Sequence, residues 1–448
     1  MHTGASTMTA SGTGLRKAVT MRYAVALYMS SVLGSGVLIL PGLAAQVAGP
    51  ASIIAWIVLS IVSYPLAYTF ASLSTRRPES GGIYGFARES FGFRAANAVG
   101  WLFTAWFITG APVVTVIAAS YLAYAFPLSR PVIYIIAGAL MLGAFLVNYR
   151  GIIISSKVQL AVIAAIVALL LVTVLASLSQ ISLANFTPFF PNGFLPIGVA
   201  AALIFWSYLG YENVSNVAEE FKNPERDFHR SIVLSVLVIG ALYLSIAVAA
   251  VGTRAYKAGG NVAPFAAMLS NALGVYGAIG TAILAVIIIF GTVNAYMTGI
   301  SRVIYATAKQ GGLPKFLSSI NTKTRVPDRA LMLLLGLSFL TLILSYVLDV
   351  DLETALLIPS GAAILVYLIG SASGIKLLKA KGARKLYPWI SLTISIIMGL
   401  FVGILLLVGI AFGAIGLFYK RGNSPTSSRD PNGNSSLVQS SVVEKRKG

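Results

Sequence analysis

Apolar segments long enough to cross a bilayer recur along nearly the whole chain, and this pattern limits its fold more than any other feature. The hydrocarbon core of a bilayer is about 30 Å thick, which a helix of about 20 apolar residues spans. Only 10% of the 448 residues are charged, and the mean hydropathy is +0.86, whereas soluble domains contain about 25% charged residues. The sequence therefore predicts an all-α polytopic membrane protein.

About twelve transmembrane helices are expected. They cover residues 21–48, 51–75, 95–126, 131–148, 157–178, 195–218, 231–252, 278–308, 329–348, 352–376, 386–402 and 404–419. The last run, 386–419, is long enough for one tilted helix or two short ones. We favour two, because Lys420 and Arg421 then lie on the cytoplasmic side.

The distribution of the net charge of +19 predicts the orientation of the chain. If both termini are cytoplasmic, Arg130, Arg254 and Lys257 alone among the 32 Lys and Arg residues fall outside, as the positive-inside rule expects. The basic balance is therefore a topology signal and not a nucleic-acid site, and we expect a multi-pass protein of the plasma membrane with no nucleic-acid partner.

The rest of the composition predicts neither an enzyme nor a metal protein. The chain has no Cys and two His, His2 and His229, and it shows no nucleophile–base pair or phosphate-binding loop. We expect no cofactor and no metal site. A polar cytoplasmic tail at 1–20 precedes a transporter domain at 21–420, and residues 421–448 have the composition of a disordered cytoplasmic tail.

Two of the expected helices are interrupted. Gly34-Ser35-Gly36 breaks the first, and residues 207–210, Ser-Tyr-Leu-Gly, break the sixth. Broken helices at bilayer depth are tolerated where they are buried in protein or line a cavity. Interruptions five spans apart indicate an inverted repeat of five plus five helices, over 21–178 and 195–378, with extra helices at 386–419 and a binding site at the breaks.

The two breaks offer complementary chemistry. The second half of helix one begins with free N–H groups at the positive end of a helix dipole, which suits a carboxylate. Gly34 and Gly36 allow close approach, and Ser35 adds a hydroxyl group. The first half of helix six ends in free carbonyl groups, which suit an ammonium group, so an amino acid zwitterion fits between them. The alternative is that the glycines mark close helix packing.

Glu212 is the acidic residue that we place deep in a span, where a carboxylate is by default functional. It is a candidate proton carrier, or alternatively a group that pins helix six to a neighbour. Aromatic residues can also line the site, although most aromatic side chains in membrane helices serve packing. They are Trp101, Trp106, Trp206, Tyr208 and Tyr296, and Trp206 stands out because it immediately precedes the break.

Four segments together resemble the amino acid–polyamine–organocation (APC) superfamily of transporters. They are GSGVLILPG in helix one, RRPESGGIYGFARESFG after helix two, FWSYLGYENVSNVAEEFKNPERDFHRSI from helix six, and SRVIYATAKQGGLPKFLSSIN after helix eight. Within the superfamily the chain most resembles bacterial exporters of methionine and branched-chain amino acids, and more distantly the arginine/agmatine antiporters.

The resemblance implies a LeuT-like fold with discontinuous helices 1 and 6, and transport by alternating access. It implies that Ser35 and Gly36 meet the substrate carboxylate and that the main chain from Trp206 to Leu209 meets the amine. The candidate substrate-binding residues are Ser31, Gly34, Ser35, Gly36, Trp206, Ser207, Tyr208, Leu209, Tyr296 and Ser360. Glu212 is the candidate coupling residue.

One departure from the family concerns helix five, where several relatives carry a lysine. Here the matching place is Ile166, and Lys157 lies near the cytoplasmic end. No intramembrane charge besides Glu212 is placed to pair with a charged substrate, so we expect a neutral, apolar amino acid, moved by proton coupling or exchange. The alternatives are a cationic amino acid or polyamine antiporter of the same superfamily, and, in another class, a membrane amino acid sensor or a channel.

Overall fold

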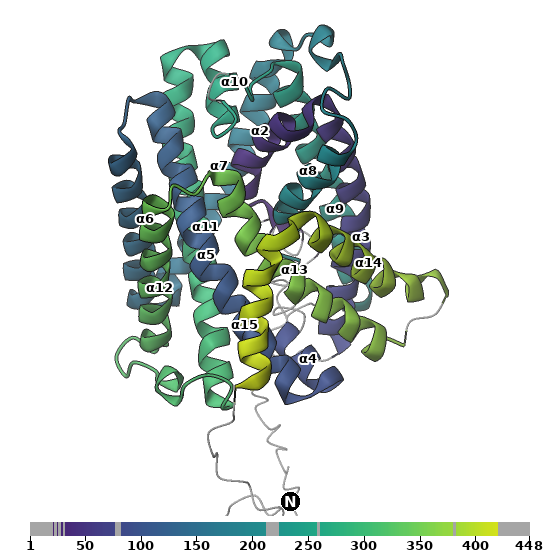
Figure 1. Ribbon diagram of the computed structural model, residues 1–448, viewed down its shortest axis with the longest axis vertical. Helices are drawn as coiled ribbons and strands as arrows, with labels where there is room; N and C mark the ends of the chain where they lie inside the picture. The colour runs from purple at the N-terminus through teal and green to yellow at the C-terminus, as the bar shows by residue number, and fades with distance from the viewer. Residues whose placement is uncertain are drawn as a thin grey trace, which may run out of the picture.

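The computed structural model describes residues 21, 25, 28, 29, 32–76, 82–211, 224–257, 260–379 and 382–419 of the chain. These residues form helices and connecting loops and contain no strand, so the protein is an all-α polytopic membrane protein (Figure 1). The principal helices are α2 (Gly36–Ala48), α3 (Ser52–Arg76), α5 (Phe93–Ala125), α6 (Arg130–Arg150), α7 (Ile152–Ser177), α8 (Leu195–Phe205), α9 (Pro224–Gly252), α11 (Val275–Lys309), α12 (Asp328–Val347), α13 (Leu352–Leu377), α14 (Tyr387–Val402) and α15 (Leu406–Phe418).

Each expected span overlaps one of these helices, in the expected order, although α7 and α9 begin five or more residues before the expected bounds. By length and composition alone, eight helical stretches of the described chain are long and apolar enough to cross a membrane. This number is smaller than twelve because α2 and α3 count as one stretch, as do α14 and α15, while α7 and α8 contribute shorter apolar helices.

Several short helices were not expected from the hydrophobic pattern. Two are α-helices, α4 (Ile83–Phe91) and α10 (Pro264–Leu273). The others are 3-10 turns, η1 (Gly49–Ala51), η3 (Leu178–Gln180), η4 (Leu183–Phe186), η5 (Trp206–Tyr208), η7 (Lys315–Ser318), η8 (Gly382–Leu386) and η9 (Gly403–Leu405). They are too short to span a bilayer, which is why a search for long apolar runs passes over them.

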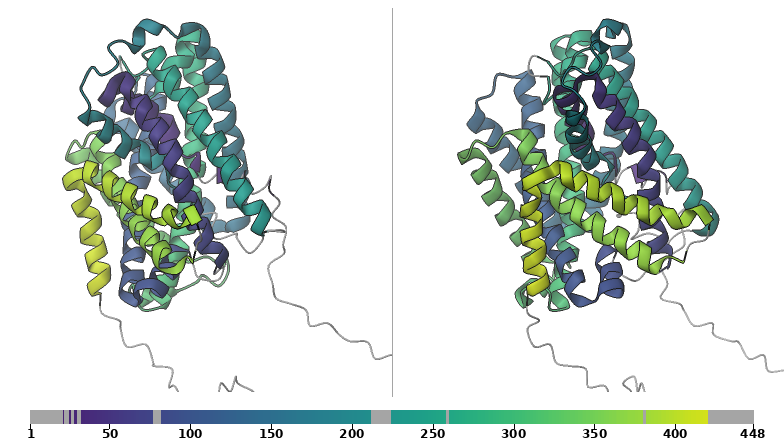
Figure 2. Two further views of the ribbon diagram at one scale, coloured as in Figure 1. Left: turned by 90° about the vertical axis from the view of Figure 1, so that its right-hand side faces the viewer. Right: turned by 45° about the vertical axis from the view of Figure 1, so that its right-hand side comes forward.

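The run at 386–419 forms two helices. Gly403 lies between α14 and α15 with φ +64°, a conformation that glycine adopts without steric strain. The chain turns there, so that α15 runs along the long axis of the molecule while α14 lies across it (Figures 1 and 2).

The centre of the bundle is α5. In its most apolar 18-residue window 89% of the residues are buried, whereas the corresponding share is 28% in both α6 and α12. Figure 1 shows α6 and α12 side by side at one edge, with α5 and α11 further in. Large apolar side chains on the outer surface include Ile135, which is 69% exposed. An apolar outer surface is what a bilayer covers.

Candidate functional site

The break in helix one lies just before α2. Leu33 N–H still makes an α-helical hydrogen bond to Met29 O at 2.8 Å. Gly34 N–H instead donates to Val32 O at 2.8 Å, and the helix is interrupted at Leu33 and Gly34. Ser35 then caps α2 from an α-helical backbone conformation, and its side chain makes no capping hydrogen bond. The first N–H groups of a helix have no acceptor within that helix. The start of α2 at Gly36 is therefore a donor site with the positive end of the helix dipole behind it.

The break in helix six follows α8. The helix tightens into the turn η5, and Leu209 is then extended, with φ −78° and ψ 145°. Gly210 has φ +126°, which favours glycine. Its N–H donates to the hydroxyl group of Tyr367 on α13 at 2.9 Å. The helical hydrogen-bond ladder thus ends at η5, and a tertiary contact holds the unwound chain.

The two breaks lie directly against each other. A Cβ atom built on Gly36 would stand 2.6 Å from Ser207 Oγ and 2.8 Å from Trp206 Cδ1. On α9, the hydroxyl group of Tyr243 lies 3.0 Å from Val32 O and 2.9 Å from Ser207 O, one carbonyl from each break. Helix one and helix six therefore meet at backbone distance, and only glycine at position 36 allows it.

A cavity adjoins this junction, with about 500 Å³ of atom-free space including the part open to the outside. Its walls come from the break before α2, from α5, from the break after α8 and from α11. They consist of Val32, Gly34, Ser35, Gly36, Trp106, Phe107, Gly110, Ala111, Val114, Trp206, Leu209, Thr292, Val293, Tyr296 and Ile300. None of these described lining residues carries a charge.

Three aromatic rings stand together in the wall of the cavity. The ring of Trp106 on α5 lies 6.2 Å from that of Trp206 in an edge-to-face arrangement and 5.8 Å from that of Tyr296 on α11. Such pairs add about 0.5–1.5 kcal/mol beyond the burial of their area. The lining of the cavity thus combines the backbone of both breaks and a serine with aromatic and aliphatic side chains.

Trp106, one of the aromatic candidates, lines this cavity, and the structure also brings six of the ten candidate substrate-binding residues to it. They are Gly34, Ser35, Gly36, Trp206, Leu209 and Tyr296. Three others lie nearby with their side chains engaged elsewhere or facing the helix junction. Ser207 faces Gly36, the Tyr208 hydroxyl group lies 2.6 Å from Ser60 Oγ, and Ser360 Oγ donates to Leu356 O at 2.7 Å.

The remaining expectations fall into two groups. Ser31 and Glu212 lie outside the described residues. Trp101, one of the aromatic residues considered for the pocket, instead donates from Nε1 to Gly312 O at 3.1 Å and is not among the lining residues. It lies in the first third of α5, where its ring is 5.9 Å from that of Tyr419.

Sequence reasoning missed much of the cavity wall. Phe107, Gly110 and Val114 on α5 and Val293 on α11 line it, yet each is an ordinary residue for a membrane helix. Tyr243 on α9 was missed as well, because the burial of its hydroxyl group and its contact with both breaks are visible only in the structure.

Comparison with known proteins agrees with this architecture. Residues 20–432 match the amino acid permease family. A Bacillus subtilis protein named as the uncharacterized amino acid permease YecA is 33% identical over 410 residues, which cover 91% of this chain and 96% of that protein. The L-methionine/branched-chain amino acid exporter YjeH of Escherichia coli is 30% identical, with 82% of this chain and 88% of that protein covered.

A more distant relative is the branched-chain amino acid permease BcaP of Lactococcus lactis, which is 26% identical over 68% of this chain and 71% of that protein. The fold and these matches define a multi-pass membrane transport protein. The chain belongs to the amino acid permease family, within the APC superfamily, and the resemblance read from the four motifs is confirmed.

Proposed function

We propose that this permease is a secondary active transporter that moves a neutral, apolar amino acid across the plasma membrane by alternating access. The observation that carries the proposal is the cavity at the two helix breaks, which combines the backbone of both breaks with an apolar wall. Paired broken helices near the midplane are the usual binding site of transporters with inverted repeats. In this proposal the repeats are residues 21–178 and 195–378.

The backbone recognises the zwitterion. The substrate carboxylate binds the N–H groups at the start of α2, beside Ser35 and Gly36, where the helix dipole favours an anion. The ammonium group binds carbonyl groups of the segment from Trp206 to Leu209, where α8 and η5 end. Ser31, Gly34 and Tyr296 complete the proposed site. Every amino acid presents these two groups, so this end of the site selects the class of ligand.

The apolar wall selects the side chain. Burying an ionised side chain without a partner is strongly unfavourable, and no described residue of the lining could pair with one. This disfavours the cationic amino acid or polyamine antiporter. The names of two relatives, a methionine/branched-chain exporter and a branched-chain permease, support a neutral apolar substrate.

Orientation and coupling belong to the same proposal. Both termini face the cytoplasm, because the basic residues then gather on that side as the positive-inside rule requires. Glu212 carries a proton during the cycle, or substrate exchange drives the flux without it. A Glu212→Gln variant separates the two, since proton coupling through this carboxylate predicts loss of the pH dependence of transport.

The proposal is tested by uptake of radiolabelled amino acids into liposomes that contain the purified protein. We expect the liposomes to accumulate leucine or methionine. With proton coupling an inward proton gradient increases this uptake, and with exchange the uptake requires unlabelled amino acid inside the liposomes. Lysine and arginine should not compete. Binding of amino acid without any flux would favour the sensor, and uptake that never saturates would favour a channel.

A further inference from the structure

The indole ring of Trp206 lies between two glycines. A Cβ atom on Gly36 of α2 would stand 2.8 Å from Cδ1, in the five-membered ring, and a Cβ atom on Gly110 of α5 would stand 3.0 Å from Cη2, on the far edge of the six-membered ring. The two ends of the indole thus rest on positions that have no side chain. Both glycines and the indole line the cavity.

Gly110 differs from glycines at which two helix backbones meet, and from glycines that face an aromatic ring away from the cavity. A Cβ atom on Gly416 of α15 would meet Ala98 Cα at 2.7 Å, so backbone approaches backbone there. Such contacts are the usual reason for glycine in membrane helices. At Gly110 the nearest atom belongs to the side chain of Trp206, and Pro359 Cβ follows at 3.4 Å. An aromatic ring also stands over Gly143 and Gly370, but of these three glycines only Gly110 lines the cavity.

Gly110 also belongs to the apolar part of the cavity lining. Phe107, Ala111 and Val114 line the cavity from the same helix, and Ile300 lines it from α11. A methyl group added at Gly110 would occupy part of this space. It would also press on the edge of the indole, which is half-buried and borders the cavity. Both effects reduce the room for a substrate side chain.

We propose that Gly110 is a specificity-determining residue: by seating the indole of Trp206 it sets the size of the compartment for the substrate side chain, so that large apolar amino acids fit. This inference rests on the proposed function. It assigns size selection to α5, whereas the carboxylate and amine are bound at the breaks in helices one and six.

The test compares Gly110→Ala with Gly299→Ala in the liposome assay. Gly299 lies on the exposed side of α11 with open space around it, so both variants make the same change within a helix. Inhibition constants are measured for alanine, 2-aminobutyrate, norvaline, leucine, methionine and phenylalanine. One methylene group in an apolar pocket changes discrimination by about 10–200-fold. We expect Gly110→Ala to raise the inhibition constants of leucine, methionine and phenylalanine, relative to that of alanine, by about 10-fold or more. Gly299→Ala should leave all ratios of inhibition constants unchanged.

A purely structural role for Gly110 predicts that the ratios of inhibition constants stay at their wild-type values, either because binding of all substrates weakens equally or because no inhibition constant changes. Either outcome overturns the inference. Val114→Ala enlarges the same compartment and is expected to shift the ratios in the opposite direction, toward phenylalanine. If Gly110→Ala yields no folded protein, unchanged ratios in Val114→Ala overturn the inference. Failure of the wild-type protein to bind or move any neutral amino acid refutes the proposed function itself, and is seen before any variant is made.

Discussion

At the scale of single residues, the hydroxyl group of Tyr243 has one proton and two carbonyl neighbours, Val32 O at 3.0 Å and Ser207 O at 2.9 Å. It therefore donates to one break at a time while holding both in place. Leaving a buried carbonyl without a donor costs about 1–3 kcal/mol. Because this hydroxyl group fixes the distance between the two breaks, its loss should affect both stability and binding.

We expect Tyr243→Phe to lower the thermal melting temperature of the purified protein and to weaken substrate affinity. The melting curve in detergent and a binding isotherm measure the two effects. Tyr276→Phe is the matched control, since Tyr276 is 82% exposed. Equal melting temperatures and affinities for the two variants would show that the Tyr243 hydroxyl group does not hold the breaks.

A side chain at Gly36 should separate the breaks and cover the N–H groups of α2. Its Cβ atom would already stand 2.6 Å from Ser207 Oγ, and valine adds two further methyl groups. Hydrogen bonds to a charged group contribute about 1.5–3 kcal/mol each, so we expect Gly36→Val to lower substrate affinity by about 10- to 100-fold or more. Equilibrium binding of labelled substrate measures it, with Gly280→Ala, which has open space around it, as the control. Wild-type affinity in Gly36→Val would remove α2 from the proposed site.

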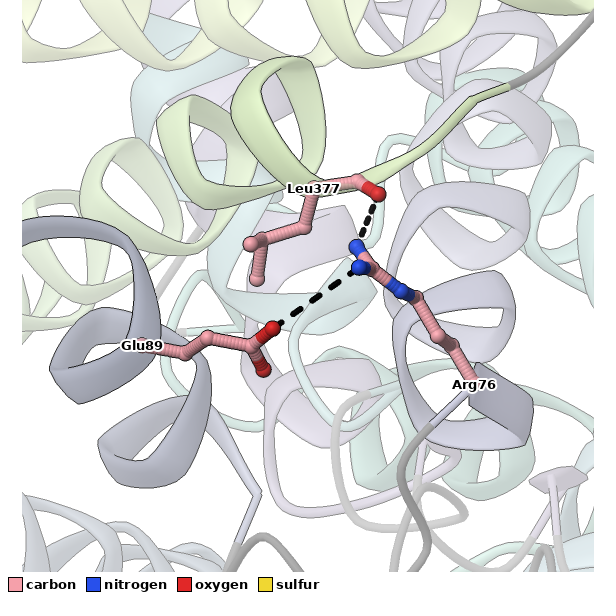
Figure 3. A network of polar contacts seen from close by, with 3 residues as sticks. All are labelled: Arg76, Glu89 and Leu377. Atoms are coloured by element: carbon pink, nitrogen blue, oxygen red, sulfur yellow. Dashed lines mark hydrogen bonds and ion pairs between the residues drawn. The ribbon is translucent and has the colours of Figure 1, made fainter.

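At the scale of elements, a polar network joins the ends of α3, α4 and α13. Figure 3 shows the guanidinium group of Arg76, at the end of α3, between the carboxylate of Glu89 on α4 and the carbonyl oxygen of Leu377 at the end of α13. Nearby, Lys376 Nζ donates to Ser90 O at 2.7 Å. The short helix α4 thus connects helices that are far apart in the sequence.

The two contacts of Arg76 should differ in strength. Its ion pair with Glu89 spans 3.7 Å between partly exposed side chains, and exposed pairs contribute about 0–1 kcal/mol. The contact with Leu377 O instead satisfies a carbonyl at a helix C-terminus, where a cation also interacts favourably with the dipole. We therefore expect Arg76→Ala to lower the melting temperature clearly more than Glu89→Gln. The reverse order would mean that the ion pair dominates.

The N-terminus of α13 depends on Asp351. Its Oδ1 accepts from Thr354 N–H at 2.9 Å and its Oδ2 from Thr354 Oγ1 at 2.7 Å. Partial burial alone would raise the pKa of this carboxyl group, but these hydrogen bonds outweigh it and the pKa lies below its ordinary value. A depressed pKa stabilises the fold above the pKa of the unfolded chain, about 4, and that stabilisation is lost as the pH falls through the lower folded-state value.

Removing this cap by Asp351→Ala should lower the free energy of unfolding by about 1 kcal/mol at neutral pH. The difference between wild type and variant should shrink as the pH is lowered below about 4. Melting temperatures measured for both proteins between pH 7 and pH 3 give the result. A difference that stays constant over this range would show that the charge of Asp351 plays no part in the cap.

At the scale of the whole molecule, Figure 1 places α4 and the end of α15 at one end of the bundle and α10 at the other. Position 129, between α5 and α6, and position 322, between α11 and α12, are both exposed and belong to loops on opposite sides in the proposed orientation. The chain contains no Cys, so an introduced thiol can be labelled without background.

We expect a membrane-impermeant maleimide to label Ser129→Cys in intact cells and to label Thr322→Cys only after the cells are opened. This follows from placing both termini in the cytoplasm, as the basic loops require. The opposite pattern would invert the proposed orientation while leaving the fold unchanged.

Much of the architecture could be read from local sequence. A helix that crosses a bilayer must be long and apolar because its backbone groups have no water to bind, and this constraint acts on each segment separately. For the same reason the interruption at Gly34-Ser35-Gly36 was visible without a structure. The short helices α4 and α10 were not visible, since neither needs to span the membrane.

The sequence by itself thus determined the all-helical membrane class, the order of the helices, the two breaks and the family. Only the tertiary structure decided which apolar residues face the cavity. Phe107 and Val114 line it, whereas Ile135, equally apolar, lies on the outer surface. In a soluble protein polarity would distinguish the two faces of a helix. In a bilayer the lipid-facing side and the core are both apolar, so packing between helices distant in sequence makes the choice.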